Sequence, residues 1–211
     1  MGGDPEDDSQ SALLWVLKLG FTTRRPNAVH WSACWRTTSA TTRRTGRPPD
    51  SARVQYAENT LSVGFLGVNV LAPVLTDEGR ADLAYALLHQ NAMPSWLYSV
   101  ENGATTVWER WNSYSKEDGF GPVEMNSFNH YSYGAIMEWM YAYMAGIARD
   151  PEHPGFRRFR LQPHVDPTGG ITKVSARHLS PYGEITSGWS LGKDGTLTYE
   201  VRSCPPAPRR R

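Results

Sequence analysis

Two long stretches of this chain are apolar on almost every side, and such segments can fold only into the interior of a helical assembly. Residues 60–75 (TLSVGFLGVNVLAPVL) and 131–147 (YSYGAIMEWMYAYMAGI) hold a single charged side chain between them, Glu138. A helix that is hydrophobic all round is buried. We therefore predict a buried helix in each stretch, the first bent or interrupted near Gly67 and Pro73, and the second ending at Gly146.

Two shorter segments also carry a helical pattern. One is Ser11–Leu19, and the other is Ala81–Ala92, which places Leu83, Leu87 and Leu88 on one face. Residues 93–129 form a long, aromatic connection rich in Asn and Gly. Loops of that length inside a compact domain usually carry function, so we expect the functional residues there.

The pattern changes after Asp150-Pro151, where apolar and polar residues begin to alternate as they do in strands. Turn sequences rich in Gly and Pro separate these runs. The predicted strands are Phe156–Leu161, Ile171–Leu179, Gly183–Leu191 and Thr196–Val201. The fold class is therefore mainly α followed by a small antiparallel β unit.

Two stretches fit neither pattern. Residues 21–50 contain six arginines and one acidic residue but no Leu or Ile, and the end of the chain reads RSCPPAPRRR. Such compositions bury too little apolar area to offset the entropy of ordering, which predicts disorder. With suitable codons, residues 22–46 read in another frame give an acidic, Leu-rich sequence with helical spacing, so a frame error and a genuine basic linker both remain open.

Overall composition excludes several classes of protein. The formal net charge is +1, which argues against nucleic-acid binding, and no apolar run is long enough to span a membrane. The acidic start MGGDPEDDSQ lacks the positive region of a secretory signal, so we expect a cytoplasmic protein. Two cysteines, Cys34 and Cys204, cannot build a disulfide framework or a structural zinc site, and no histidine spacing suits a metal. We expect no metal and no cofactor.

The long connection contains one carboxylate between two indoles. In ATTVWERWNSY, residues 104–114, Glu109 lies between Trp108 and Trp111 in a segment otherwise poor in charge. Aromatic walls tune a carboxylate for acid–base chemistry, and indole faces also suit sugar rings. The alternative is that Glu109 pairs with Arg110 or caps a helix.

A second polar cluster follows in GFGPVEMNSFNHYSYG, residues 119–134. Four polar side chains fall within five positions: Asn126, Ser127, Asn129 and His130. If this cluster is functional, His130 binds a hydroxyl group or tunes the charge of a neighbouring group in a cleft. The alternative is that Ser127 or Asn129 caps the following helix while His130 is a hydrogen-bonded core residue.

Three motifs in this order resemble the bacterial α-L-rhamnosidases of glycoside hydrolase family 78. They are GFLGVNVLAPVLTDEG, PSWLYSVENGATTVWERWNSY and GPVEMNSFNHYSYGAIMEWMYAYMAGI, and the resemblance covers roughly residues 54–201. It implies a partial (α/α)6 six-hairpin barrel with a small C-terminal antiparallel β-sandwich domain. The expected domains are an atypical segment at 1–53, the barrel part at 54–150, the β-sandwich at 151–202 and a basic Pro/Arg tail at 203–211.

The same resemblance implies inverting hydrolysis of terminal α-L-rhamnosides, with a rhamnose-containing glycoside as the partner. The general base of the family falls on Glu109 and the sugar-contacting histidine on His130. Trp108, Arg110, Trp111 and Asn126 match positions around the same pocket. The acidic motif that supplies the general acid has no match in residues 1–53. We therefore expect these 211 residues alone to be inactive; the alternative function is a non-catalytic carbohydrate-binding or scaffold protein. The sequence does not indicate an oligomeric state.

Overall fold

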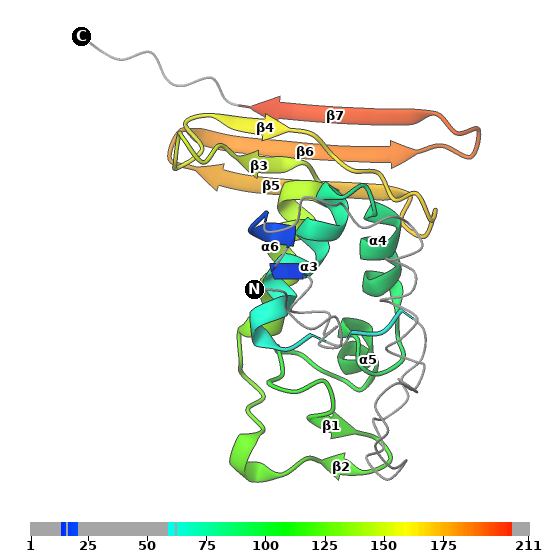
Figure 1. Cartoon of the computed structure of the whole chain (residues 1–211). Coiled ribbons are helices and arrows are strands. Elements are labelled where there is room, and N and C mark those ends of the chain that lie inside the picture. The colour runs from blue at the N-terminus through cyan, green and yellow to red at the C-terminus, as the bar shows by residue number, and fades with distance from the viewer. Residues whose placement is uncertain (1–13, 16, 21–58, 62, 204–211) are drawn as a thin grey trace. The chain divides into compact units, whose positions relative to one another are not determined.

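The computed structural model describes residues 14–15, 17–20, 59–61 and 63–203, and the chain divides into two compact units, 1–135 and 136–211 (Figure 1). Within the predicted helix Ser11–Leu19, residues 14, 15, 17 and 18 are helical, and the others in 11–16 lie outside the described residues. The prediction for 21–50 and most of that for 202–211 also lie outside them. Arg202 and Ser203 are described and end the last strand that the structure describes, so for these two residues the prediction of disorder is wrong.

The first predicted buried helix is confirmed in the first unit, with different ends. Helix α3 spans Phe65–Asp77 and buries eight of its thirteen residues. It begins after Gly64 because the preceding segment is extended, with the Leu61 amide donating to the Pro94 carbonyl at 2.9 Å. Of the expected bend or interruption near Gly67 and Pro73, the interruption is wrong, since α3 continues through both residues. Burial on nearly every side compensates for the one backbone hydrogen bond that proline cannot make.

The second predicted helix of this unit is also confirmed. Helix α4 spans Ala81–His89 and ends three residues before the predicted Ala92. Leu87 and Leu88 are buried on its inner face together with Ala84 and Tyr85. Helices α3 and α4 pack against each other and form the core of the unit.

The long connection has more structure than the sequence indicates. Helix α5 spans Trp96–Glu101, and the buried Ser95 caps it by accepting a hydrogen bond from the Tyr98 amide at 3.1 Å. A short hairpin follows, formed by strands β1 (Tyr114–Ser115) and β2 (Gly119–Phe120). Two 3₁₀ turns, η1 (Val123–Met125) and η2 (Ser132–Ala135), complete the unit.

The predicted helix at 131–147 is helical but not one regular helix. After η2 comes one α-helical turn, α6 (Ile136–Trp139), and then a π-helical turn, η3 (Met140–Met144). The helical path ends at Gly146, as predicted, because Gly146 adopts φ +80°. Ile147 was expected in the helix but begins strand β3 (Ile147–Arg149), which pairs with β4 (Phe159–Leu161).

Three further strands form an antiparallel sheet in the second unit. They are β5 (Lys173–Ser180), β6 (Gly183–Leu191) and β7 (Leu197–Ser203), in the spatial order β5-β6-β7. The two antiparallel sheets confirm the expected change from helices to strands. Ile185, Ser187 and Trp189 alternate along β6 and are buried. Ser187 and Trp189 donate side-chain hydrogen bonds to the carbonyls of Ala145 (2.5 Å) and Met144 (2.8 Å).

Among the described residues, no helix combines the length and the apolarity needed to cross a lipid bilayer.

Candidate functional site

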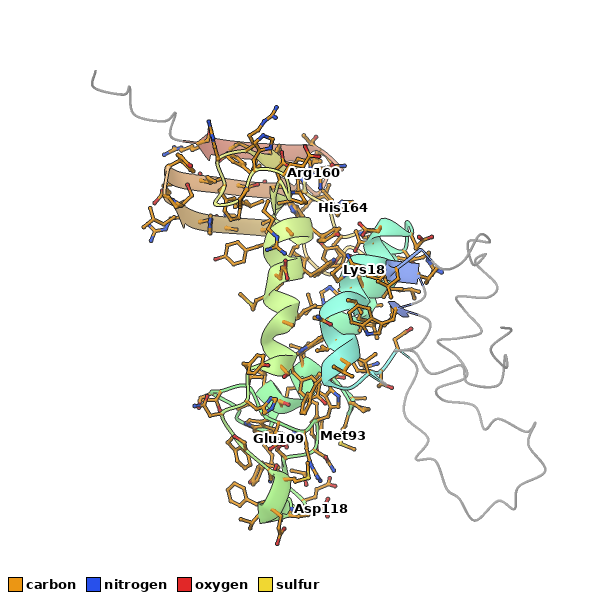
Figure 2. All side chains as sticks on the ribbon, turned by 60° about the vertical axis from the view of Figure 1, so that its left-hand side comes forward. Lys18, Met93, Glu109, Asp118, Arg160 and His164 are labelled. Carbon is orange, nitrogen blue, oxygen red and sulfur yellow. The ribbon has the colours of Figure 1, made fainter. Side chains whose placement is uncertain are left out.

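Glu109 lies in the loop region of the first unit, and Asp118 lies in the turn that joins strands β1 and β2 (Figure 2). The loop carrying Glu109 runs beside the segment 126–130. The Glu109 amide donates to the Ser127 carbonyl at 2.9 Å, and the His130 amide donates to the Val107 carbonyl at 2.9 Å. These bonds bring together the two polar motifs that the sequence separates by eighteen residues.

The carboxylate of Glu109 is held by the same segment. Its Oε2 accepts a hydrogen bond from the Ser127 amide at 2.7 Å, while its backbone amide donates to Ser127. A short bond from an amide to a charged carboxylate fixes the orientation of that carboxylate. Within the described residues Glu109 makes no ion pair with Arg110, so the pairing alternative is not supported.

His130 belongs to an aromatic cluster that reaches back to the start of α3. Its ring stacks on Phe65, with centroids 4.5 Å apart, and is parallel to Tyr131, with centroids 5.6 Å apart. The Nδ1 atom accepts a hydrogen bond from the Ser132 amide at 3.4 Å. Among the described residues, no hydrogen bond is made to its Nε2 atom.

Trp111 continues this cluster toward the interior. It stacks on Tyr133 with ring centroids 3.7 Å apart and meets Trp96 edge-on at 5.8 Å. Its indole nitrogen donates to the Val63 carbonyl at 3.5 Å. Burial raises the pKa of the Tyr133 hydroxyl, because the phenolate is poorly solvated there.

Trp108 lies in a second aromatic cluster. It is 6% exposed and packs edge-on against Phe128 and Tyr114, while Phe120 contacts both of those rings. The two indoles that flank Glu109 in the sequence therefore anchor its loop in two different aromatic clusters.

The remaining two predicted residues make different contacts. The Asn126 Nδ2 atom donates to the Ser113 carbonyl at 2.9 Å, and its Oδ1 is buried without a hydrogen-bond partner among the described residues. The Arg110 guanidinium has no ion pair in the described part of the chain. What each of the six predicted residues contributes toward a substrate stays a prediction.

Ser113 and Phe65 contact predicted site residues but were not singled out from the sequence. Phe65 stacks on the His130 ring, and Ser113 accepts hydrogen bonds from the Arg110 amide and from the Asn126 side chain. Ser127, which the sequence places in the polar cluster, contacts Glu109 itself. Phe65 could not be found by local pattern, since it reaches His130 only through the tertiary fold. Among the described residues, no group of three or more His, Cys, Asp or Glu side chains could hold a metal ion.

Comparison with known proteins places both units in one family. Residues 8–144 match the model of the bacterial alpha-L-rhamnosidase six-hairpin glycosidase domain, and residues 146–207 match the bacterial alpha-L-rhamnosidase C-terminal domain. An alpha-L-rhamnosidase of Formosa agariphila is 48% identical over 149 residues, which is 71% of this chain. One from Streptomyces avermitilis is 40% identical over 200 residues, which is 94% of this chain.

Solved structures give the same result. The crystal structure of the Streptomyces avermitilis alpha-L-rhamnosidase complexed with L-rhamnose matches 94% of this chain, with a TM-score of 0.72 and 38% identity. The Aspergillus terreus enzyme matches 95% with a TM-score of 0.71 and 28% identity. This chain spans only 16% and 18% of the two curated relatives and 17% and 21% of the two solved chains. The chain belongs to the bacterial α-L-rhamnosidase family and carries parts of both the six-hairpin glycosidase domain and the C-terminal domain.

Proposed function

We propose that Glu109 is the general base of an inverting α-L-rhamnosidase site that acts on terminal α-L-rhamnosides. The observation that carries this proposal is the geometry of its carboxylate. Oε2 is engaged by the Ser127 amide at 2.7 Å, and within the described residues no hydrogen bond is made to Oε1. A carboxylate held through one oxygen presents the other to a water molecule, from which it removes a proton.

His130 and its aromatic neighbours supply the sugar-binding side of this site. The Phe65–His130–Tyr131 stack places rings beside the imidazole, whose Nε2 is available to a hydroxyl. Sugars are bound by this combination, in which C–H faces pack on rings while hydroxyls find polar partners. The Streptomyces avermitilis relative, whose crystal structure is a complex with L-rhamnose, supports rhamnose as the sugar.

Inverting hydrolysis also needs a carboxylic acid on the opposite side of the glycosidic bond, ~6.5–9.5 Å from the base. Residues 1–53 hold no match for the acidic motif of the family, and the chain spans about a sixth of the length of the Formosa agariphila relative. We therefore propose that the acid comes from a part of the fold that these residues do not include. The 211 residues alone should release no nitrophenol from 4-nitrophenyl α-L-rhamnoside.

A chimera tests the role of Glu109 directly. Residues 54–201 would replace the matching part of the Streptomyces avermitilis relative, so that the rest of that enzyme supplies the acid. Glu109→Gln should lower kcat by ~10²–10⁴-fold, because a positioned base contributes that much. Glu124→Gln is the control, since Glu124 is an exposed acid of the same connection.

The product anomer gives the second readout. Proton NMR during the first minutes of the reaction should show released rhamnose as the β-anomer, which is inverted relative to the α-linked substrate. Full activity in the Glu109→Gln chimera, or a retained anomer, would refute the proposed role.

The alternative function is sugar binding without catalysis. It is favoured by the aromatic cluster around His130, which needs no general acid to bind a sugar. Calorimetry with L-rhamnose separates the two functions in the 211-residue chain. A binding protein keeps its affinity in Glu109→Gln and loses it in His130→Ala, without activity in the chimera.

A further inference from the structure

The backbone around Glu109 is closed into a hydrogen-bonded ring by one buried serine. Ser113 is 0% exposed, and its hydroxyl accepts a hydrogen bond from the Arg110 amide at 3.1 Å. Its own amide donates to the Arg110 carbonyl at 3.3 Å. Ser113 therefore fixes the tight turn that immediately follows Glu109.

The same serine also holds the opposite segment. Its carbonyl accepts two hydrogen bonds, one from the Asn126 side chain and one from the Gly121 amide, both at 2.9 Å. Asn126 directly precedes Ser127, whose amide binds the Glu109 carboxylate. The ring thus runs from Glu109 through Arg110, Ser113, Asn126 and Ser127 back to Glu109; we call it the Ser113 ring.

Two features show that this ring is closely packed. A Cβ atom added at Gly121 would lie 3.2 Å from the Asn126 Nδ2 and 3.4 Å from the Ser113 carbonyl oxygen. The Asn126 Oδ1 is buried with no partner among the described residues, so the carboxamide is held by its nitrogen. Closely packed polar groups leave few alternative positions for the backbone they join.

We propose that Ser113 is a positioning residue that orients the Glu109 carboxylate by holding both segments that carry it. The carboxylate's own contact joins Glu109 to Ser127, and the two residues that Ser113 holds, Arg110 and Asn126, directly adjoin them. Removing the Ser113 hydroxyl removes one of the two hydrogen bonds that hold the turn on the Glu109 side and leaves the Arg110 amide without its buried acceptor. The inference deepens the proposed function, since its consequence for catalysis rests on Glu109 being the base.

The molecule offers a closely matched control. Ser95 is also 0% exposed, and its hydroxyl also accepts one backbone amide hydrogen bond, from Tyr98 at 3.1 Å. It lies at the start of α5, outside the Ser113 ring. Ser95→Ala and Ser113→Ala therefore remove the same kind of buried bond, but only Ser113→Ala removes a bond of the Ser113 ring.

The test uses the whole 211-residue chain without substrate, so that its result does not depend on activity. Hydrogen exchange of the Ser127 amide reports whether that amide still binds the carboxylate. The carbon-13 resonance of the Glu109 carboxyl group, assigned with Glu109→Gln, reports the carboxylate itself. Exchange of the α3 amides serves as the reference for global stability.

Ser113→Ala should speed exchange of the Ser127 amide roughly tenfold and shift the Glu109 carboxyl resonance, while the α3 amides keep their protection. Ser95→Ala should change neither readout. Equal effects of the two substitutions, or an unprotected Ser127 amide in the parent chain, would overturn the proposal.

If Ser113→Ala does not fold, Gly121→Ala decides the question, because it displaces Asn126 and retains the Ser113 hydroxyl. A shifted Glu109 resonance supports the ring, and an unchanged resonance refutes it. If Glu109→Gln leaves the chimera fully active while the exchange and resonance results are as expected, the role of Glu109 as base is refuted. The role of Ser113 in orienting the carboxylate then still stands.

Discussion

Replacing Trp189 by phenylalanine tests how the β domain is attached to the end of its own helical segment. The Trp189 side chain is 2% exposed, and its indole nitrogen donates to the Met144 carbonyl at 2.8 Å. Phenylalanine removes the donor and leaves a buried acceptor unpaired, which costs ~1–3 kcal/mol. It also buries on the order of 40 Å² less apolar surface, worth ~1 kcal/mol. The free energy of unfolding of the second unit should fall by about 2–4 kcal/mol.

The assay is urea denaturation followed by far-UV circular dichroism, with amide exchange of β6 as the local measure. Trp15→Phe is the matched control, because the Trp15 indole makes the same kind of bond, to the Leu66 carbonyl at 2.9 Å, but is 37% exposed. Water can replace that bond, so its loss should cost under ~1 kcal/mol. Equal losses for the two variants would refute the argument that burial makes the Trp189 bond important.

Two further substitutions test the backbone and the electrostatics. Gly146→Ala should lower the melting temperature far more than Gly155→Ala: both glycines have positive φ, but a Cβ at Gly146 would lie 2.3 Å from the Pro163 nitrogen, whereas nothing lies within 4 Å at Gly155. Similar decreases in melting temperature would show that the strain of a positive φ, and not the clash with Pro163, determines both losses. The hydrogen bond from Arg80 holds the pKa of the Asp82 carboxyl below its usual value. Its stabilisation is therefore present above pH ~4 and is lost as pH falls through the folded-state pKa. Between pH 5 and 3 in acid denaturation, Asp82→Asn should lose less stability than the parent, by under ~1 kcal/mol because the carboxylate is 45% exposed. A parent and variant with parallel pH profiles would contradict this.

The elements that the sequence predicts well are those formed by contacts close in the chain. Helix α4 and the strands β5, β6 and β7 lie within three residues of their predicted ends. Their side-chain periodicity and their turn residues are local properties, so a single sequence contains the necessary information. The three motifs also indicated the family correctly.

The elements that were predicted badly depend on distant partners. Strand β3 was read as the end of a helix, because Ile147 is apolar and its strand partner Leu161 lies fourteen residues further along. Helix α5 was read as loop, since six residues with no buried side chain leave no periodic apolar face. The π-helical turn η3 replaced regular helix where Met144 and Ala145 accept bonds from β6.

The sequence by itself determined which residues could do chemistry: one carboxylate between two indoles, and one histidine in a polar cluster. Only the tertiary structure decided how they are combined. It brought Ser127 to the Glu109 carboxylate, Phe65 to the His130 ring and Ser113 to both segments. The physical reason is that residue types and spacing act along the chain, whereas hydrogen bonds between loops form only after helices and strands have packed.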